Sequence, residues 1–154
     1  MPEVDGARMG AMGGSFGGYM SNWMGTQTDR FACIVTHASV FHMEAFAQTT
    51  DVPAWFFLET GVAPPEGRDA IDRYSPHRYI AKWKTPTLVI HGEKDYRVPI
   101  GEALSLFESL QRHNVESELL VFPDEGHWIT RPRNVIAWYD SVLGFVNKHL
   151  TRDA

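Results

Sequence analysis

The chain has 154 residues, of which 44% are hydrophobic and 21% charged. This length is typical of one domain, and the composition excludes disordered and fibrous classes. The formal net charge is −5, with lysine and arginine scattered along the chain. Nucleic acid and anionic membranes are therefore not the expected partners.

Cysteine content and hydropathy exclude further classes of protein. The single cysteine, Cys33, has no partner for an internal disulfide, and no Cys/His group has zinc-ligand spacing. No apolar run approaches the roughly 20 residues that span a bilayer. Residues 1–5 lack the basic and apolar regions of a signal peptide. The sequence therefore predicts a soluble, cytoplasmic domain without a metal site or membrane partner.

The N-terminal half begins with an apolar stretch at 8–12 that predicts a buried strand ending at Gly13-Gly14. Residues 17–27 suit a helix with one apolar side, and 32–36 predict a second buried strand. Residues 41–73 mix aromatic residues with proline and glycine, which indicates helical pieces joined by loops.

The C-terminal half repeats the alternation of strand and helix. A β-branched run at 87–91 predicts a third strand, and a helix opens at Pro99. Residues 118–122 predict a fourth strand, and 132–150 a last amphipathic helix. This order predicts an α/β fold with a mostly parallel sheet and helices on both faces. In such sheets, functional residues gather at the carboxyl ends of the strands.

A glycine-rich turn follows the first predicted strand. Gly13-Gly14-Ser15-Phe16-Gly17-Gly18 matches the pattern G-x-S-x-G of a nucleophile elbow, a tight strand-to-helix turn that exposes a strained serine. The N–H groups of the following helix point to where an oxyanion would form, and the Phe16 N–H is the expected first donor. The alternative is a purely structural turn. We favour Ser15 as a nucleophile because the strand and the helix are both predicted.

A serine nucleophile needs a base that a carboxylate orients. The third predicted strand is followed by Glu93 and Asp95, and the fourth by Asp124-Glu125-Gly126-His127. The order Ser15, Asp95, His127 is that of α/β-hydrolases. The alternative roles are a helix-terminal charge for Asp95 and a solvated loop residue for Glu93.

Other histidines compete for the role of base. His37 also ends a strand and is the nearest rival, whereas His91 is interpreted as a residue near the core. Only His127 lies in a short loop directly after a strand and behind a glycine. We therefore favour His127.

These residues carry a resemblance. The segment 13–20 (GGSFGGYM) resembles the nucleophile region of the prolyl oligopeptidase family of serine peptidases, particularly acylaminoacyl peptidase and bacterial dipeptidyl aminopeptidase. Three further segments agree with that family, 74–76 (YSP), 85–99 (TPTLVIHGEKDYRVP) and 122–127 (FPDEGH). The resemblance extends over nearly the whole chain.

The resemblance implies a triad of Ser15, Asp95 and His127 that hydrolyses peptide or acyl-aminoacyl bonds without a cofactor. It implies that Arg97 contacts a substrate backbone carbonyl and that Val98 lines the S1 pocket. The alternatives are a surface charge for Arg97 and ordinary packing for Val98. The aromatic residues at 55–57 fall near the family's aromatic S1 walls, but no motif aligns them.

The resemblance also implies a domain organisation. Residues 1–154 correspond to the C-terminal part of an α/β-hydrolase catalytic domain, without the family's N-terminal β-propeller and without the first strands of the hydrolase domain. The loop that supplies the second oxyanion donor is missing too. The first strand would then be an unpaired edge, which predicts self-association or assembly with the missing upstream part.

Two other functions remain open at this point. An esterase similar to dienelactone hydrolases would use the same triad, because a fold does not specify the acyl group. The chain could also be a catalytically silent hydrolase fragment.

Overall fold

The structure is a computed structural model that describes residues 5–151. Residues 1–4, part of the segment without signal-peptide features, and residues 152–154 lie outside the described part. The four strands are β1 (Gly10–Gly14), β2 (Cys33–His37), β3 (Thr87–Gly92) and β4 (Ser117–Phe122). They form one parallel sheet in the order β1-β2-β3-β4. The predicted α/β class and parallel sheet are confirmed.

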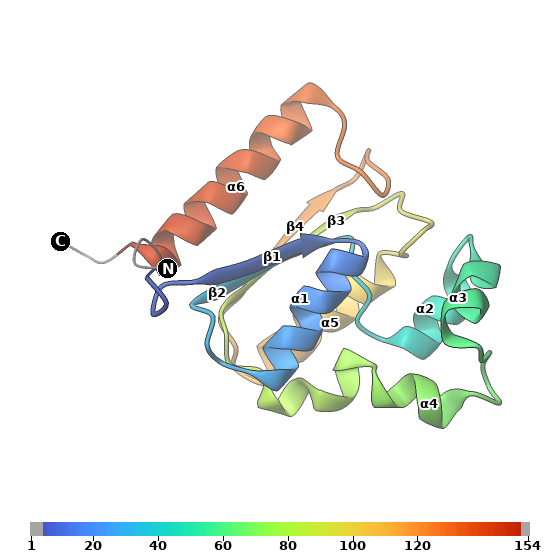
Figure 1. Cartoon of the computed structure of the whole chain (residues 1–154). Coiled ribbons are helices and arrows are strands. Elements are labelled where there is room, and N and C mark those ends of the chain that lie inside the picture. Colours follow the sequence, from blue (N-terminus) through green and yellow to red (C-terminus); the bar gives the residue numbers. More distant parts are fainter. Residues whose placement is uncertain (1–4, 152–154) are drawn as a thin grey trace.

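Helices cover both faces of this sheet (Figure 1). One face packs against α1 (Phe16–Gln27) and α5 (Gly101–Arg112), and α6 (Pro132–Leu150) lies on the other. Neighbouring residues of a strand point to opposite faces. Ile34 and Val89 accordingly belong to the α5 side of the core, whereas their neighbours belong to the α6 side. Burial on both faces explains why these strands are continuously apolar.

The region 41–73 contains three short helices, as the sequence predicts. They are α2 (Met43–Thr49), α3 (Pro53–Thr60) and α4 (Arg68–Arg73). A 3₁₀ helix, η1 (Pro76–Lys82), follows and is not predicted by the sequence pattern. The three α-helices lie together beside the sheet, at the end toward which β1 points (Figure 1). They share a small apolar core, which is made of Val40, Phe46, Ala47, Phe56, Ile71 and Val98.

The first strand differs from its predicted bounds of 8–12. Its glycines stay in the sheet, since Gly13 and Gly14 pair with Thr36 and His37 of β2. The strand therefore runs directly into Ser15. This register brings the serine to the carboxyl edge of the sheet, where β3 and β4 also end.

Candidate active site

Ser15 occupies the turn between β1 and α1. Its backbone has φ 56° and ψ −119°, an unusual conformation for a residue with a side chain. Its N–H donates to the carbonyl of His37 at 2.9 Å. A Cβ added to Gly13 would lie 2.2 Å from the Gly17 carbonyl oxygen, so the turn closes only with glycine there. The geometry is that expected of a nucleophile elbow.

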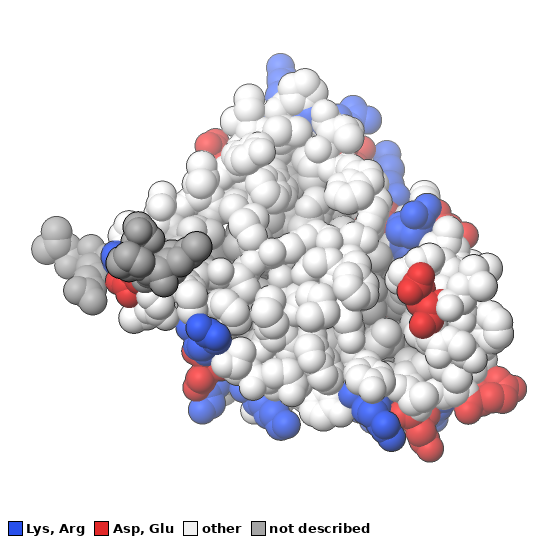
Figure 2. Space-filling model, in the orientation of Figure 1, with Lys and Arg blue, Asp and Glu red and all other residues white. Residues whose placement is uncertain are grey.

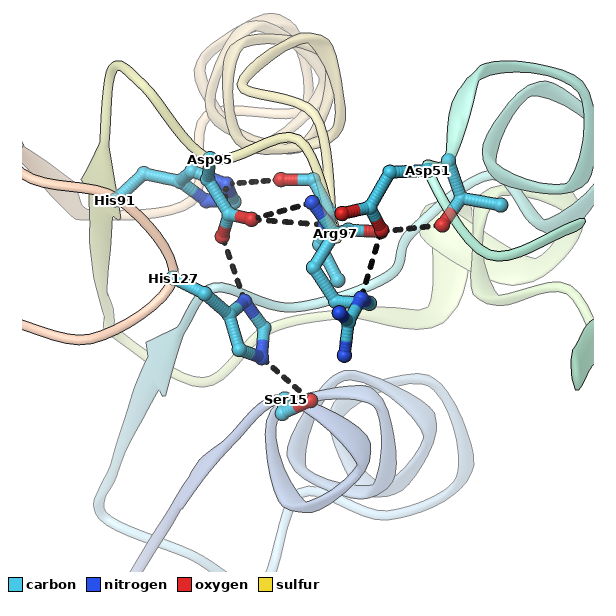
Figure 3. A network of polar contacts seen from close by, with 8 residues as sticks. Ser15, Asp51, His91, Asp95, Arg97 and His127 are labelled. Atoms are coloured by element: carbon cyan, nitrogen blue, oxygen red, sulfur yellow. Dashed lines mark hydrogen bonds and ion pairs between the residues drawn. The ribbon is translucent and has the colours of Figure 1, made fainter.

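His127 bridges the serine and a carboxylate (Figure 3). Its Nε2 lies 2.9 Å from the Ser15 Oγ, and its Nδ1 lies 2.8 Å from the Asp95 Oδ2. An ionised carboxylate only accepts hydrogen bonds, so Nδ1 carries the proton and Nε2 is free to accept from the hydroxyl. A serine hydroxyl in such a contact has an acceptor for its proton.

Asp95 is held firmly in the loop after β3. It is 3% exposed, and its Oδ1 accepts from the backbone N–H groups of Arg97 and Val98, both at 2.9 Å. These bonds aim its other oxygen at His127. Glu93, the other candidate acid, is exposed, and its carboxylate makes no hydrogen bond within residues 5–151. The structure therefore brings Asp95 to His127 and leaves Glu93 in solvent.

The competing histidines take other roles. His91 is fully buried, and its Nε2–H donates to the Val98 carbonyl at 2.7 Å, as expected of a residue near the core. Burial lowers the pKa of His91, and it lowers the pKa of His37 to about 4. The His37 Nε2 is buried and has no hydrogen-bond partner in the described part of the chain. Neither imidazole bonds to the serine hydroxyl.

The N-terminus of α1 faces the same place. Phe16 is the first residue of the helix, so its N–H has no acceptor within the helix. The helix dipole places partial positive charge there. Both features suit an oxyanion that forms beside Ser15.

Arg97 and Val98 line the same cavity as Ser15. The Arg97 Nε donates to the Asp51 Oδ1 at 2.7 Å, and the Arg97 guanidinium extends from there toward the serine side (Figure 3). Two further bonds join these segments, from the Asp51 N–H to the Tyr96 carbonyl at 2.9 Å and from the Thr50 Oγ1 to the Arg97 carbonyl at 2.7 Å. The connection between α2 and α3 therefore holds Arg97 in place through hydrogen bonds.

An apolar cavity of about 900 Å³ opens beside Ser15. Val98 lies at its wall and is 3% exposed. The sequence left most of this wall unassigned; its larger apolar and aromatic members include Tyr19, Met43, Phe46, Trp55, Phe56, Ile71 and Tyr74. The resemblance implied Val98, and the unaligned aromatic run at 55–57 also pointed to this wall; Trp55 and Phe56 line the cavity, whereas Phe57 is not among its lining residues. The other members come together through the packing of α1 to α4.

Among residues 5–151, no three His, Cys, Asp or Glu side chains are grouped to hold a metal ion. No helix in that part of the chain combines the length and apolar character needed to cross a membrane.

The profile of the prolyl oligopeptidase family matches residues 2–153. The chain belongs to this family. Dipeptidyl-peptidase 5 of Porphyromonas gingivalis is 36% identical over 157 aligned residues, which cover 98% of this chain and 23% of that protein. Probable dipeptidyl-peptidase 5 of Emericella nidulans is 41% identical over 151 residues, covering 95% of this chain and 21% of the relative.

Solved structures agree with the fold. Pyrococcus horikoshii acylaminoacyl peptidase superimposes with a TM-score of 0.92 at 28% identity, over 99% of this chain and 26% of that one. A structure of acylaminoacyl peptidase in complex with Z-Gly-Gly-Phe-chloromethyl ketone gives the same TM-score, 0.92, at 28% identity, over 99% of this chain and 25% of that one. The chain thus spans about a quarter of the length of these relatives.

Proposed function

We propose that this chain carries the catalytic triad of a serine peptidase, with Ser15 as nucleophile, His127 as general base and Asp95 as the carboxylate that orients it. The observation that carries the proposal is the pair of contacts at His127, 2.9 Å to the Ser15 Oγ and 2.8 Å to the Asp95 Oδ2. The names of the relatives, dipeptidyl-peptidase and acylaminoacyl peptidase, support a peptide or acyl-peptide substrate.

The reaction follows from this geometry. The Ser15 Oγ attacks the carbonyl carbon while the His127 Nε2 takes the hydroxyl proton, and Asp95 stabilises the resulting imidazolium. The Phe16 N–H donates to the oxyanion. When the tetrahedral intermediate collapses, the C–N bond breaks and His127 returns the proton to the leaving amine. Water, activated by His127, then hydrolyses the acyl-enzyme in the same way and regenerates Ser15.

We propose that the apolar cavity binds the side chain on the acyl side of the scissile bond. Its volume of about 900 Å³ and its apolar and aromatic walls suit a large apolar side chain. In this proposal Val98 contributes to the wall and Arg97 binds a substrate carbonyl. The phenylalanine next to the chloromethyl ketone in the acylaminoacyl peptidase complex is a group of this kind.

Labelling by a fluorophosphonate probe tests the triad directly. We expect a covalent adduct on Ser15, located by mass spectrometry, and its loss in Ser15→Ala. No adduct on a folded wild-type chain would contradict the proposal for this chain. Aminoacyl arylamides and short-chain aryl esters, compared as substrates of the unlabelled wild-type protein, then distinguish peptidase from esterase activity.

We also propose that the chain forms part of a larger hydrolase domain whose other part covers the free edge of β1. This strand pairs only with β2 within the described residues. Its Met12 is exposed and lines one pocket together with two other exposed side chains, Trp128 and Tyr139. Charged residues gather around the margin of this face and leave its centre uncharged (Figure 2). Such an edge favours pairing with another strand.

Light scattering on the purified chain tests this second proposal. We expect the wild-type chain to self-associate through the open edge and Met12→Lys to reduce the association, because a lysine on an edge strand opposes pairing. A monomer at all concentrations would count against it.

A further inference from the structure

Glu125 is a buried acid that the reaction above does not use. It lies two residues before His127 and is 3% exposed. Its Oε1 accepts from the Arg131 N–H at 2.8 Å and from the Asn134 Nδ2 at 2.9 Å. Its Oε2 accepts from the N–H and the Oγ1 of Thr130, both at 3.2 Å. Burial raises the pKa of this carboxyl, but the hydrogen bonds outweigh it and hold the pKa below its usual value.

The main chain of Glu125 forms a hydrogen bond to a different segment, the loop after β3. Its carbonyl accepts from the Lys94 N–H at 2.9 Å, in the loop that carries Asp95. The two loops are in close contact, since a Cβ on Gly92 would lie 2.1 Å from the Gly126 carbonyl oxygen. Glu125 therefore joins the loop of Asp95 to the segment that follows His127.

His127 has no regular secondary structure to hold it. It lies in the connection between β4 and α6, and the ring of the next residue, Trp128, is largely exposed. On the C-terminal side of His127, the Glu125 carboxylate accepts hydrogen bonds from Thr130, Arg131 and Asn134. On the N-terminal side of His127, the Glu125 backbone carbonyl accepts a hydrogen bond from the loop that carries Asp95. Both ends of the segment that carries His127 are thus tied to one residue.

We propose that Glu125 is a positioning residue that holds His127 between Ser15 and Asp95. The inference rests on the proposed function, in which the His127 Nε2 must stay within hydrogen-bond reach of the Ser15 Oγ. Removal of the carboxylate leaves four part-buried donor groups, on Thr130, Arg131 and Asn134, without this acceptor, which favours movement of the segment toward solvent. A displacement of about 1 Å at such a site costs on the order of 100-fold in rate.

The variant Glu125→Gln tests the proposal with little change of volume. Its amide nitrogen replaces one acceptor with a donor, which then faces N–H or O–H groups. We expect the fluorophosphonate labelling rate of Ser15 to fall by about 10- to 100-fold. We also expect the low-field NMR resonance of the His127 Nδ1 proton to broaden or shift. Glu93→Gln removes the same charge from an exposed site at the same sheet edge and leaves both readouts unchanged.

Two milder variants test the proposal if Glu125→Gln does not fold. Asn134→Ala and Thr130→Val each remove one side-chain donor, and we expect each to slow labelling by a smaller factor. A merely structural Glu125 would lower the melting temperature of a variant while leaving labelling and the His127 resonance of the folded protein unchanged. That result, in Glu125→Gln or in both smaller variants, overturns the proposal.

The two proposals fail in different ways. If wild-type Ser15 is not labelled, the proposed function fails for this chain, and the His127 resonance of the folded wild-type and Glu125→Gln proteins still decides the role of Glu125. If wild-type Ser15 is labelled and neither readout changes in Glu125→Gln, only the positioning role is lost.

Discussion

The Nε2 of His127 lies 2.9 Å from the Oγ of Ser15, although 112 residues separate them in the chain. The contact forms because both residues directly follow the carboxyl end of a strand, Ser15 at β1 and His127 in the connection after β4. The parallel sheet brings these ends to one edge. A local turn and the order of the strands thus bring Ser15 and the loop of His127 to the same edge of the sheet.

Asp95→Asn is predicted to reduce catalysis strongly. An amide oxygen can still accept from the His127 Nδ1, but it carries no charge to stabilise the imidazolium, and the amide group can favour the wrong tautomer. We expect the hydrolysis or labelling rate to fall by about 10⁴-fold, as in other serine triads. Asp69→Asn, at an exposed position of α4, is the control and should behave as wild type. An active Asp95→Asn protein would remove Asp95 from the triad.

Gly13→Ala is predicted to disrupt the elbow. The new methyl group would lie 2.2 Å from the Gly17 carbonyl oxygen, a backbone atom that cannot move without opening the turn. We expect a lower melting temperature and loss of Ser15 labelling.

Gly144→Ala provides the contrasting case. A Cβ at this position in α6 meets no atom within 4 Å. Because alanine favours helix, we expect the free energy of unfolding to rise by about 0.5–1 kcal/mol with labelling unchanged. Equal effects of the two glycine substitutions would show that the close approach at Gly13 is not a constraint.

Arg97→Ala is predicted to affect substrate binding more than turnover. In the proposed role the guanidinium binds a substrate carbonyl, so we expect KM to rise by about tenfold. Asp51→Asn should have a smaller effect in the same direction, because Asp51 holds the Arg97 Nε at 2.7 Å. Arg112→Ala, which removes an exposed arginine paired with Glu108, is the control. An unchanged KM in Arg97→Ala would favour a surface charge.

Glu102 is predicted to make stability depend on pH. Burial raises its pKa from the usual 4.5 to about 7, although its Oε2 accepts from the backbone N–H groups of Phe41 and His42. Between these pH values the folded chain binds more protons than the unfolded chain. The free energy of unfolding should therefore fall as pH rises from 4.5 through about 7.

Glu102→Gln should remove that pH dependence. Denaturant unfolding of both proteins below and above this pH range measures it, with the variant gaining stability relative to wild type as pH rises. A constant difference between the two proteins across the range would contradict the raised pKa.

Ser15→Gly is predicted to stabilise the protein while abolishing labelling. Ser15 has φ 56°, where a side chain is strained and glycine is not. Strain of this kind costs about 1–3 kcal/mol. We expect a higher melting temperature for Ser15→Gly than for Ser15→Ala, which keeps the strain. Equal melting temperatures would indicate an unstrained turn.

The sequence predicted the strands and the turn at Ser15 because each leaves a local signal, and it named Ser15, Asp95 and His127, which the structure brings into contact. Apolar runs indicated the strands, and glycines flank Ser15. The roles of Asp51, Glu102 and Glu125 were not predictable in this way. Each acts through contacts such as the Arg97–Asp51 pair, which joins positions 46 residues apart and has no periodic pattern. The cavity walls were missed for the same reason, since α1 to α4 form them jointly.

The sheet order β1-β2-β3-β4 also has a consequence for synthesis of the chain. Each new strand pairs with the one made just before it, so the sheet can grow while the chain leaves the ribosome. Ser15 leaves the ribosome before His127, its proposed base, which follows the last of these strands. In the proposed function, a chain synthesised only as far as β4 therefore carries a serine without its base, and Ser15 is activated only after these four strands and the loop of His127 have been made.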